Sequence, residues 1–99
     1  MEYKGDNVVL RKGQYTNGRL ALQLDTEDGF PYATLTVNMP EYNLREGEAY
    51  IKDYSENEGM LNWMEKKGLV KEVLGYVKSG FVQIPRVKLD MEKIEEVTE

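Results

Sequence analysis

The densest group of side chains that could do chemistry lies between Lys52 and Gly59, in the order Lys-Asp-Tyr-Ser-Glu-Asn-Glu-Gly. Three of its oxygen-bearing residues occupy positions one, three and five of a calcium-loop pattern, which directs alternate oxygens onto one cation: Asp53, Ser55 and Asn57. The pattern then fails, because Glu58 stands where glycine is required and Met64 stands where a bidentate acid is required. We therefore expect no metal and no cofactor.

The amino-acid composition excludes the most common catalytic mechanisms. With no Cys and no His among 99 residues, the sequence offers no thiolate nucleophile, no imidazole base and no Cys- or His-based zinc site. Ser79 follows Lys78, but neighbours in a strand point to opposite faces, so no Ser–Lys pair is implied. The 18 acids are not diagnostic, because scattered carboxylates are usually solvated surface. We expect a protein that is not an enzyme, and an enzyme of unknown type is the third hypothesis.

The seven tyrosines are the other group that could form a site. Tyrosine is enriched in binding faces, although cross-strand tyrosines also simply cover small sheets. Together with Lys on a sheet face, the tyrosines could stack single-stranded bases. The net charge of -5 argues against wholesale neutralisation of phosphates. Residues 1–89, however, hold 12 Lys and Arg against 13 Asp and Glu, so the net charge belongs mainly to the last ten residues.

The elements that must position these groups begin with a three-stranded antiparallel meander in the first forty residues. Strands are predicted over 8–12, 20–25 and 32–38, and the last two alternate apolar and polar residues. The dipeptides Asn17-Gly18 and Asp28-Gly29 predict the turns between them, because these residues tolerate turn conformations.

A short helix and a second group of strands follow. Ser55 and Glu58 fit a capping box, which predicts a helix over about 56–67. Strands are predicted over 70–77 and 81–84. Pro85 should restrict the second of these to a sheet edge or a break, because proline cannot donate to a ladder.

These elements predict an α+β fold, an antiparallel β-meander of about five or six strands with one short helix packed on one face. Residues 1–89 form a single α+β domain. Residues 90–99 form an acidic C-terminal tail, disordered or a frayed surface helix in which apolar residues recur every three positions. The predicted core consists of Leu20, Leu22, Leu24, Ala33, Leu35, Val37, Leu61 and Met64.

Four segments carry a resemblance to a known family: residues 12–21, 33–40, 51–61 and 79–85. They resemble a domain-of-unknown-function family of short uncharacterised proteins, many encoded on conjugative plasmids and integrative elements of Gram-positive and gut bacteria. The resemblance reaches about Leu89 and implies a mobile-element accessory setting without any activity to transfer. Its most distinctive stretch contains the candidate binding surface: Lys52, Asp53, Tyr54, Glu56 and Asn57.

The leading hypothesis is a non-enzymatic protein-interaction module that binds an unidentified host or element-encoded protein. The alternative is a single-stranded nucleic-acid-binding module that uses a Tyr/Lys sheet face. We expect a cytoplasmic monomer or weak dimer without a membrane segment, because no apolar run approaches the roughly 18 residues of a spanning helix and the N-terminus lacks a signal-like stretch.

Overall fold

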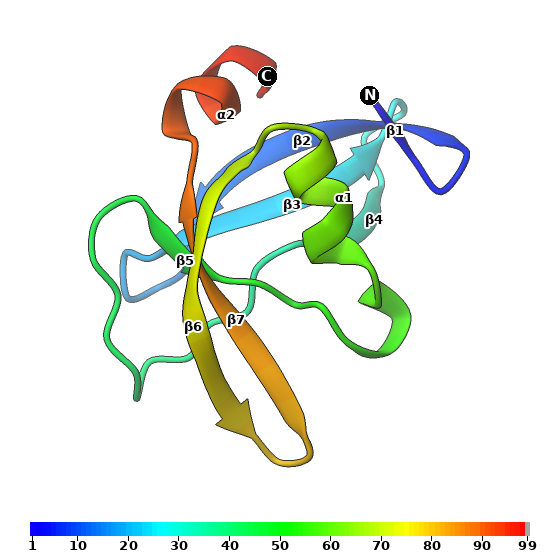
Figure 1. The fold of residues 1–99 in the computed structure, drawn as a ribbon. Helices are drawn as coiled ribbons and strands as arrows, with labels where there is room; N and C mark the ends of the chain where they lie inside the picture. The colour runs from blue at the N-terminus through cyan, green and yellow to red at the C-terminus, as the bar shows by residue number, and fades with distance from the viewer. Residues whose placement is uncertain (99) are drawn as a thin grey trace.

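The structure, a computed structural model that describes residues 1–98, contains two antiparallel sheets and two α-helices (Figure 1). The first sheet has the order β1-β2-β3-β4, with β1 at Glu2–Tyr3, β2 at Asp6–Gln14, β3 at Leu20–Thr26 and β4 at Pro31–Thr34. The second has the order β5-β7-β6, with β5 at Glu48–Tyr50, β6 at Val70–Ser79 and β7 at Val82–Leu89. The helices are α1 at Met60–Lys66 and α2 at Met91–Val97.

The α+β class is confirmed, with differences in the count of elements. Within residues 1–98, seven strands divide into two sheets, where one sheet of five or six strands was expected, and there are two helices in place of one. The radius of gyration is 12.7 Å, close to the roughly 13 Å of a folded chain of this length.

The N-terminal meander has the predicted turns and strand faces. At the first turn the Tyr15 N–H donates to the Arg19 carbonyl (2.8 Å), and Gly18 has a φ of +85°, which only glycine adopts readily. Leu22 and Leu24 are fully buried, as their alternation predicts. The third predicted strand is shorter than expected, because β4 ends at Thr34.

After β4 the chain crosses from the first sheet to the second, and this crossing breaks the predicted alternation. Leu35 and Thr36 are both buried although they are neighbours. The Leu35 N–H donates to the Leu22 carbonyl on β3 (2.9 Å), and Thr36 forms an isolated bridge with Ile51 beside the second sheet. Val37, predicted in the core, is only partly buried.

The Thr36 hydroxyl is a buried polar group that joins the crossing segment to β3 and to the turn before it. Its Oγ1 accepts a hydrogen bond from the Leu22 N–H (3.2 Å) and lies 2.8 Å from the Tyr15 hydroxyl oxygen. Because buried polar groups must be hydrogen-bonded, these contacts fix how the crossing segment lies against β3.

The second sheet contradicts the prediction for Pro85, because β7 runs through the proline and is the central strand. The Pro85 carbonyl accepts from the Ile51 N–H (3.0 Å), just past the end of β5 at Tyr50. In an antiparallel strand the N and O of one residue point to the same neighbour. The missing N–H of Pro85 therefore faces Ile51, just past the end of β5, and the hydrogen bonds between β7 and β6 are not affected.

One apolar core joins both sheets and both helices. It includes five of the predicted core residues in buried form, whereas Leu20 and Ala33 pack at its border. A second, smaller cluster consists of Met39, Tyr50 and Ile84, with Val37 packed against it. The five buried residues of the prediction are Leu22, Leu24, Leu35, Leu61 and Met64.

The capping box at Ser55 and Glu58 is not formed, and the predicted continuous helix is broken. Ser55 has a φ of +56° and begins a 3-10 turn over Ser55–Asn57. Gly59, with a φ of +91°, then separates this turn from α1. The N-cap residues are instead Tyr54 for the 3-10 turn and Gly59 for α1, and neither makes a side-chain cap hydrogen bond.

The C-terminal segment, expected as a disordered or frayed tail, forms α2 up to Val97. The Asp90 carboxylate accepts from the Lys93 N–H (3.0 Å) as an N-cap. Ile94 is completely buried in the main core, and Met91 and Val97 pack against the same core. The apolar residues that recur every three positions therefore form a docking face.

We expect Thr36→Val to lower the free energy of unfolding by about 1–3 kcal/mol, because the buried Leu22 N–H loses its acceptor while the side-chain shape is kept. Thr34→Val, at an exposed position of β4, is the matched control and should change it by less than about 0.5 kcal/mol. Urea unfolding followed by circular dichroism measures both. Equal effects at the two positions would show that the Thr36 hydroxyl does not hold the crossing.

Candidate functional site

The predicted binding surface lies on the segment between β5 and α1. Its residue Asp53 caps helix α1. The Asp53 Oδ1 accepts a hydrogen bond from the Leu61 N–H (2.9 Å), one of the first N–H groups of α1. An acceptor eight residues upstream thus replaces the local capping box. The Asp53 carboxylate is consequently engaged in holding α1.

Asn57, another residue of the predicted surface, lies inside the molecule. Its side chain is 2% exposed, and its Nδ2 donates to the Thr34 carbonyl at the end of β4 (2.5 Å). This bond ties the 3-10 turn to the first sheet. Asn57 therefore anchors the segment to the first sheet and does not form part of its surface.

Among the five predicted residues, Glu56 is exposed, and Lys52 beside it is half-buried. The Lys52 Nζ lies 2.6 Å from the Glu56 Oε2 and 5.8 Å from the centre of the Tyr54 ring. The hydrogen bond from Lys52 lowers the pKa of the Glu56 carboxyl to about 2, helped by hydrogen bonds from its own backbone and from Ser55. The same hydrogen bond raises the pKa of Lys52, against a smaller opposing effect of burial.

A binding role for this segment stays a prediction. Of its five residues, Glu56 is exposed, Asn57 is buried, and the other three are half-buried: Lys52, Asp53 and Tyr54. The structure brings all five together, but Asp53 and Asn57 have internal partners that explain their presence.

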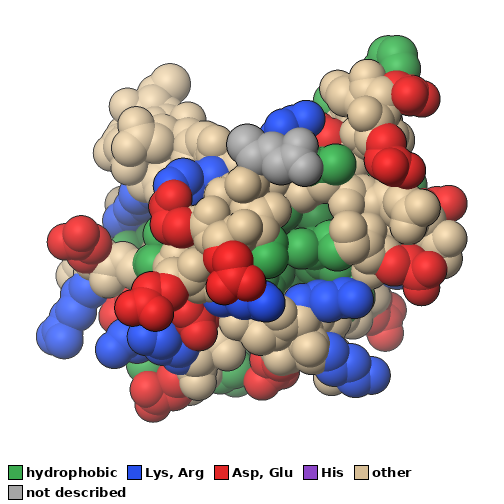
Figure 2. All heavy atoms as spheres, turned by 90° about the horizontal axis from the view of Figure 1, so that it is seen from above, with side chains coloured by type: hydrophobic (Ala, Val, Ile, Leu, Met, Phe, Trp, Pro, Cys, Tyr) green, Lys and Arg blue, Asp and Glu red, His purple; other side chains and the backbone are tan. Residues whose placement is uncertain are grey.

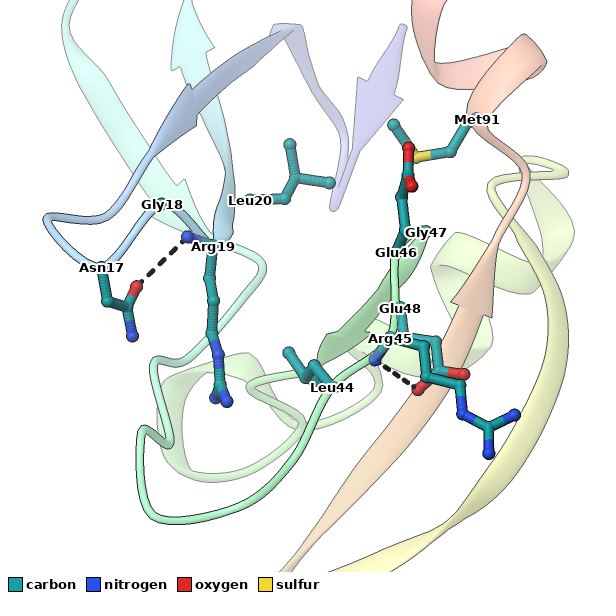
Figure 3. Close-up of a pocket in the computed structure, with 10 residues that line it drawn as sticks. All are labelled: Asn17, Gly18, Arg19, Leu20, Leu44, Arg45, Glu46, Gly47, Glu48 and Met91. Carbon is teal, nitrogen blue, oxygen red and sulfur yellow. Dashed lines mark hydrogen bonds between the residues drawn. The ribbon is translucent and has the colours of Figure 1, made fainter.

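A cavity of about 340 Å³ lies between the β2–β3 turn, the loop before β5 and the start of α2 (Figure 3). In Figure 3 the Arg19 side chain extends from the turn toward this loop. Its guanidinium donates to the carbonyls of Met39 (2.7 Å) and Tyr42 (2.5 Å). Arg19 is therefore a clamp on the long connection between the two sheets.

A second groove, of about 270 Å³, lies on the second sheet, and we call it the tyrosine groove. Its lining comes from the loop after Met39, from β5, from the middle of β6 and from β7: Tyr42, Asn43, Tyr50, Gly75, Tyr76, Val77 and Arg86. Burial raises the pKa of Tyr50, and the positive charges of Arg86 and Arg19 act in the opposite direction. The groove thus combines tyrosine rings with a guanidinium.

Sequence reasoning counted these tyrosines but did not assemble them into one site. Residues of the groove are up to 44 positions apart, from Tyr42 to Arg86, so no local pattern joins them. One signal was available. Gly75 interrupts the predicted strand 70–77, and a glycine inside a strand often marks a bulge, which is present between Val73 and Gly75.

Basic and acidic side chains are interspersed on the face of the molecule that is seen from above. Figure 2 shows Lys, Arg, Asp and Glu interspersed around a hollow with hydrophobic side chains at its floor. In the part of the chain that the structure describes, five cations pair with acids, and each would have to leave its partner to neutralise a phosphate. The pairs are Arg11–Asp25, Lys12–Glu95, Lys52–Glu56, Arg86–Glu48 and Lys93–Glu96.

Two further observations define the class of protein. Among residues 1–98, no three Asp or Glu side chains come together in a way that could hold a metal ion. Neither helix in this part of the chain is long and apolar enough to cross a membrane. The fold and the surface thus define a small α+β domain whose concave sites combine aromatic, arginine and amide side chains.

The chain belongs to the family described as "Domain of unknown function (DUF4313)", whose match covers residues 9–99. The resemblance to a domain-of-unknown-function family is thereby confirmed. The match extends past Leu89 and includes the C-terminal segment that the resemblance left outside. No curated protein and no solved structure matches the chain.

We expect Asp53→Ala to destabilise the protein by about 0.5–2 kcal/mol, the range of lost helix caps, because the Leu61 N–H loses its acceptor. Asp53→Asn keeps a side-chain oxygen at the same place and should restore most of this loss. Chemical unfolding of the two variants provides the comparison. If Asp53→Asn destabilises as much as Asp53→Ala, the hydrogen bond to α1 is not the reason.

We expect the Glu56 carboxyl to titrate at about 2, below its ordinary value of 4.5, when its side-chain carbon is followed by NMR. Since folding lowers the pKa of Glu56, the Lys52–Glu56 pair stabilises the fold at pH values above 4.5. This stabilisation is lost as the pH falls toward 2.

Two substitutions separate the causes of this shift. Lys52→Gln should raise the pKa of Glu56 toward its ordinary value. Lys4→Gln is the matched control, because the Lys4 Nζ donates to the Glu56 backbone carbonyl (3.2 Å) and should leave the titration nearly unchanged. A wild-type Glu56 that titrates at its ordinary value would contradict the pairing.

Proposed function

We propose that this DUF4313 protein is a non-enzymatic protein-interaction module whose partner contacts the free end of the β6–β7 hairpin. The observation that carries the proposal is Phe81, whose side chain is 107% exposed relative to an extended reference. Phe81 lies in the turn between Ser79 and Val82, the last paired residues of the hairpin. Figure 1 shows this turn standing away from the rest of the fold.

The exposure of Phe81 has a thermodynamic consequence. Burying a phenylalanine side chain stabilises a protein by about 1.5–3 kcal/mol, and the fold forgoes this contribution here. Aromatic side chains are over-represented among the residues that dominate binding energies. These properties support a surface that becomes covered in a complex.

The proposal extends to the setting of the protein. The absence of Cys and His supports a non-enzymatic role, because the usual nucleophiles and bases are missing. We place the partner among host or element-encoded proteins of the cytoplasm, which is the mobile-element setting that the family resemblance implies.

We expect immobilised protein to retain a specific partner from a lysate of the source organism, and Phe81→Ser to lose it or weaken it by about 30-fold or more, as for a residue that dominates an interface. Phe30→Ser is the matched control, because Phe30 is 67% exposed in the turn between β3 and β4. Capture followed by mass spectrometry, and titration of the recovered partner, measure both effects.

Equal retention by wild type, Phe81→Ser and Phe30→Ser would overturn the hairpin as the contact surface. The melting temperature of Phe81→Ser should stay close to that of the wild type, since an exposed side chain contributes little to stability. This comparison separates lost binding from lost folding.

A further inference from the structure

We propose that the tyrosine groove binds a nucleotide, with the base against Tyr76 and Tyr42 and the phosphate at the Arg86 guanidinium. This site is separate from the hairpin tip and does not depend on the protein-interaction role. The lining residues meet from four segments of the chain, and each supplies a group that a nucleotide requires.

The size of the groove selects a ligand with about one ring system. Its volume of about 270 Å³ lies just below the roughly 300–1,000 Å³ of sites for drug-sized ligands. Gly75 contributes bare backbone to the lining, and a Cβ at this position would meet no heavy atom within 4 Å. The space directly over Gly75 is therefore open.

The tyrosine rings are held in place before any ligand arrives. The Tyr42 hydroxyl donates to the Lys78 carbonyl (3.2 Å), and the Tyr50 hydroxyl donates to the Asn43 carbonyl (2.8 Å). The Tyr42 and Tyr50 ring centres are 6.2 Å apart with the planes tilted by 59°. Tyr76 remains 57% exposed and offers its ring to a base. Rings fixed in this way lose little conformational entropy on stacking.

The charge of the groove selects an anionic ligand. The Arg86 side chain is 36% exposed, and its Nη1 lies 3.9 Å from the Glu48 carboxylate, beyond hydrogen-bond distance. A phosphate can therefore displace this loose ion pair and accept a bidentate contact from the guanidinium fork. A neutral proline-rich segment would also fit tyrosine rings, but it would leave this guanidinium without an anion. A planar ring joined to a phosphate satisfies both features.

The site differs from the phosphate track of a general nucleic-acid-binding protein. Because Arg86 is the one cation among the residues that line the groove, and four other cations pair with acids elsewhere, the groove should neutralise about one phosphate. The logarithm of the binding constant should then fall with the logarithm of salt concentration with a slope near -1, far from the slope near -6 or steeper of extended tracks.

The test is an NMR titration of the full chain with adenosine 5′-monophosphate and, separately, with a single-stranded oligodeoxythymidine of eight nucleotides. We expect saturable shifts of the amide signals of Asn43, Gly75, Tyr76, Val77 and Arg86. Equal affinity for both probes identifies a free nucleotide as the ligand. Tighter binding of the oligonucleotide identifies one nucleotide of a single strand.

Four variants sharpen the result. Tyr76→Ala should weaken binding by about 5- to 100-fold through the loss of stacking, and Tyr32→Ala, an exposed tyrosine of the first sheet, should not. Arg86→Gln should weaken binding of the monophosphate but leave the phosphate-free nucleoside adenosine unchanged. Phe81→Ser should keep nucleotide binding, so that failure of the hairpin proposal and failure of this one are distinguishable.

Three outcomes would overturn the proposal. These are no saturable shift with either probe up to about 10 mM, shifts confined to residues outside the groove, and equal losses of affinity from Tyr76→Ala and Tyr32→Ala. A proline-rich peptide that saturates the groove signals while both nucleotide probes leave them unmoved would likewise assign the groove to a protein ligand.

Discussion

The crossing between the two sheets at Leu35–Val37 is the constraint on which the rest of the structure depends. The Leu35 N–H is bonded to β3, and the Leu35 carbonyl accepts from the Lys52 N–H (2.8 Å) after β5. The Val37 N–H donates to the Tyr50 carbonyl (3.0 Å), so backbone bonds reach both sheets within three residues. The buried Thr36 hydroxyl accepts a further hydrogen bond from the Leu22 N–H on β3. One apolar core can form between the sheets because this crossing sets their relative position.

The crossing also determines where the tyrosine groove lies. After Val37 the chain loops outward, and Arg19 holds two of its carbonyls from the turn of the first sheet. Tyr42 is thereby kept beside Tyr50 on the second sheet. A residue of one sheet thus positions a ring in a groove on the other sheet. The groove is consequently a property of the whole fold, and its lining cannot be assembled from any single element.

Local patterns predicted the elements whose structure depends on neighbouring residues. Leu22 and Leu24 alternate in β3 because one face of that strand is buried, and the turn at Gly18 follows from its backbone freedom. The capping of α1 by Asp53 spans eight residues, beyond the local capping pattern. The burial of Thr36 and the central position of Pro85 depend on partners farther away in the sequence. The candidate site was taken from one continuous segment for the same reason, whereas the groove draws on four.

The acidic C-terminal segment is part of the folded domain, because α2 docks on the main apolar core. The sequence predicts that these charges lie on a disordered or frayed tail, which would leave residues 1–89 nearly neutral. Ile94 is instead buried in the common core, and Glu95 pairs with Lys12 on β2. The charge of -5 therefore belongs to the body and sets an unfavourable long-range field for anions. However, α2 lies at the opposite end of the molecule from the β6–β7 turn (Figure 1), and the longest extent is 34 Å. Exposed charges are screened over roughly 8–10 Å in physiological salt, so the acids of α2 have little effect on an anion at the β6–β7 turn.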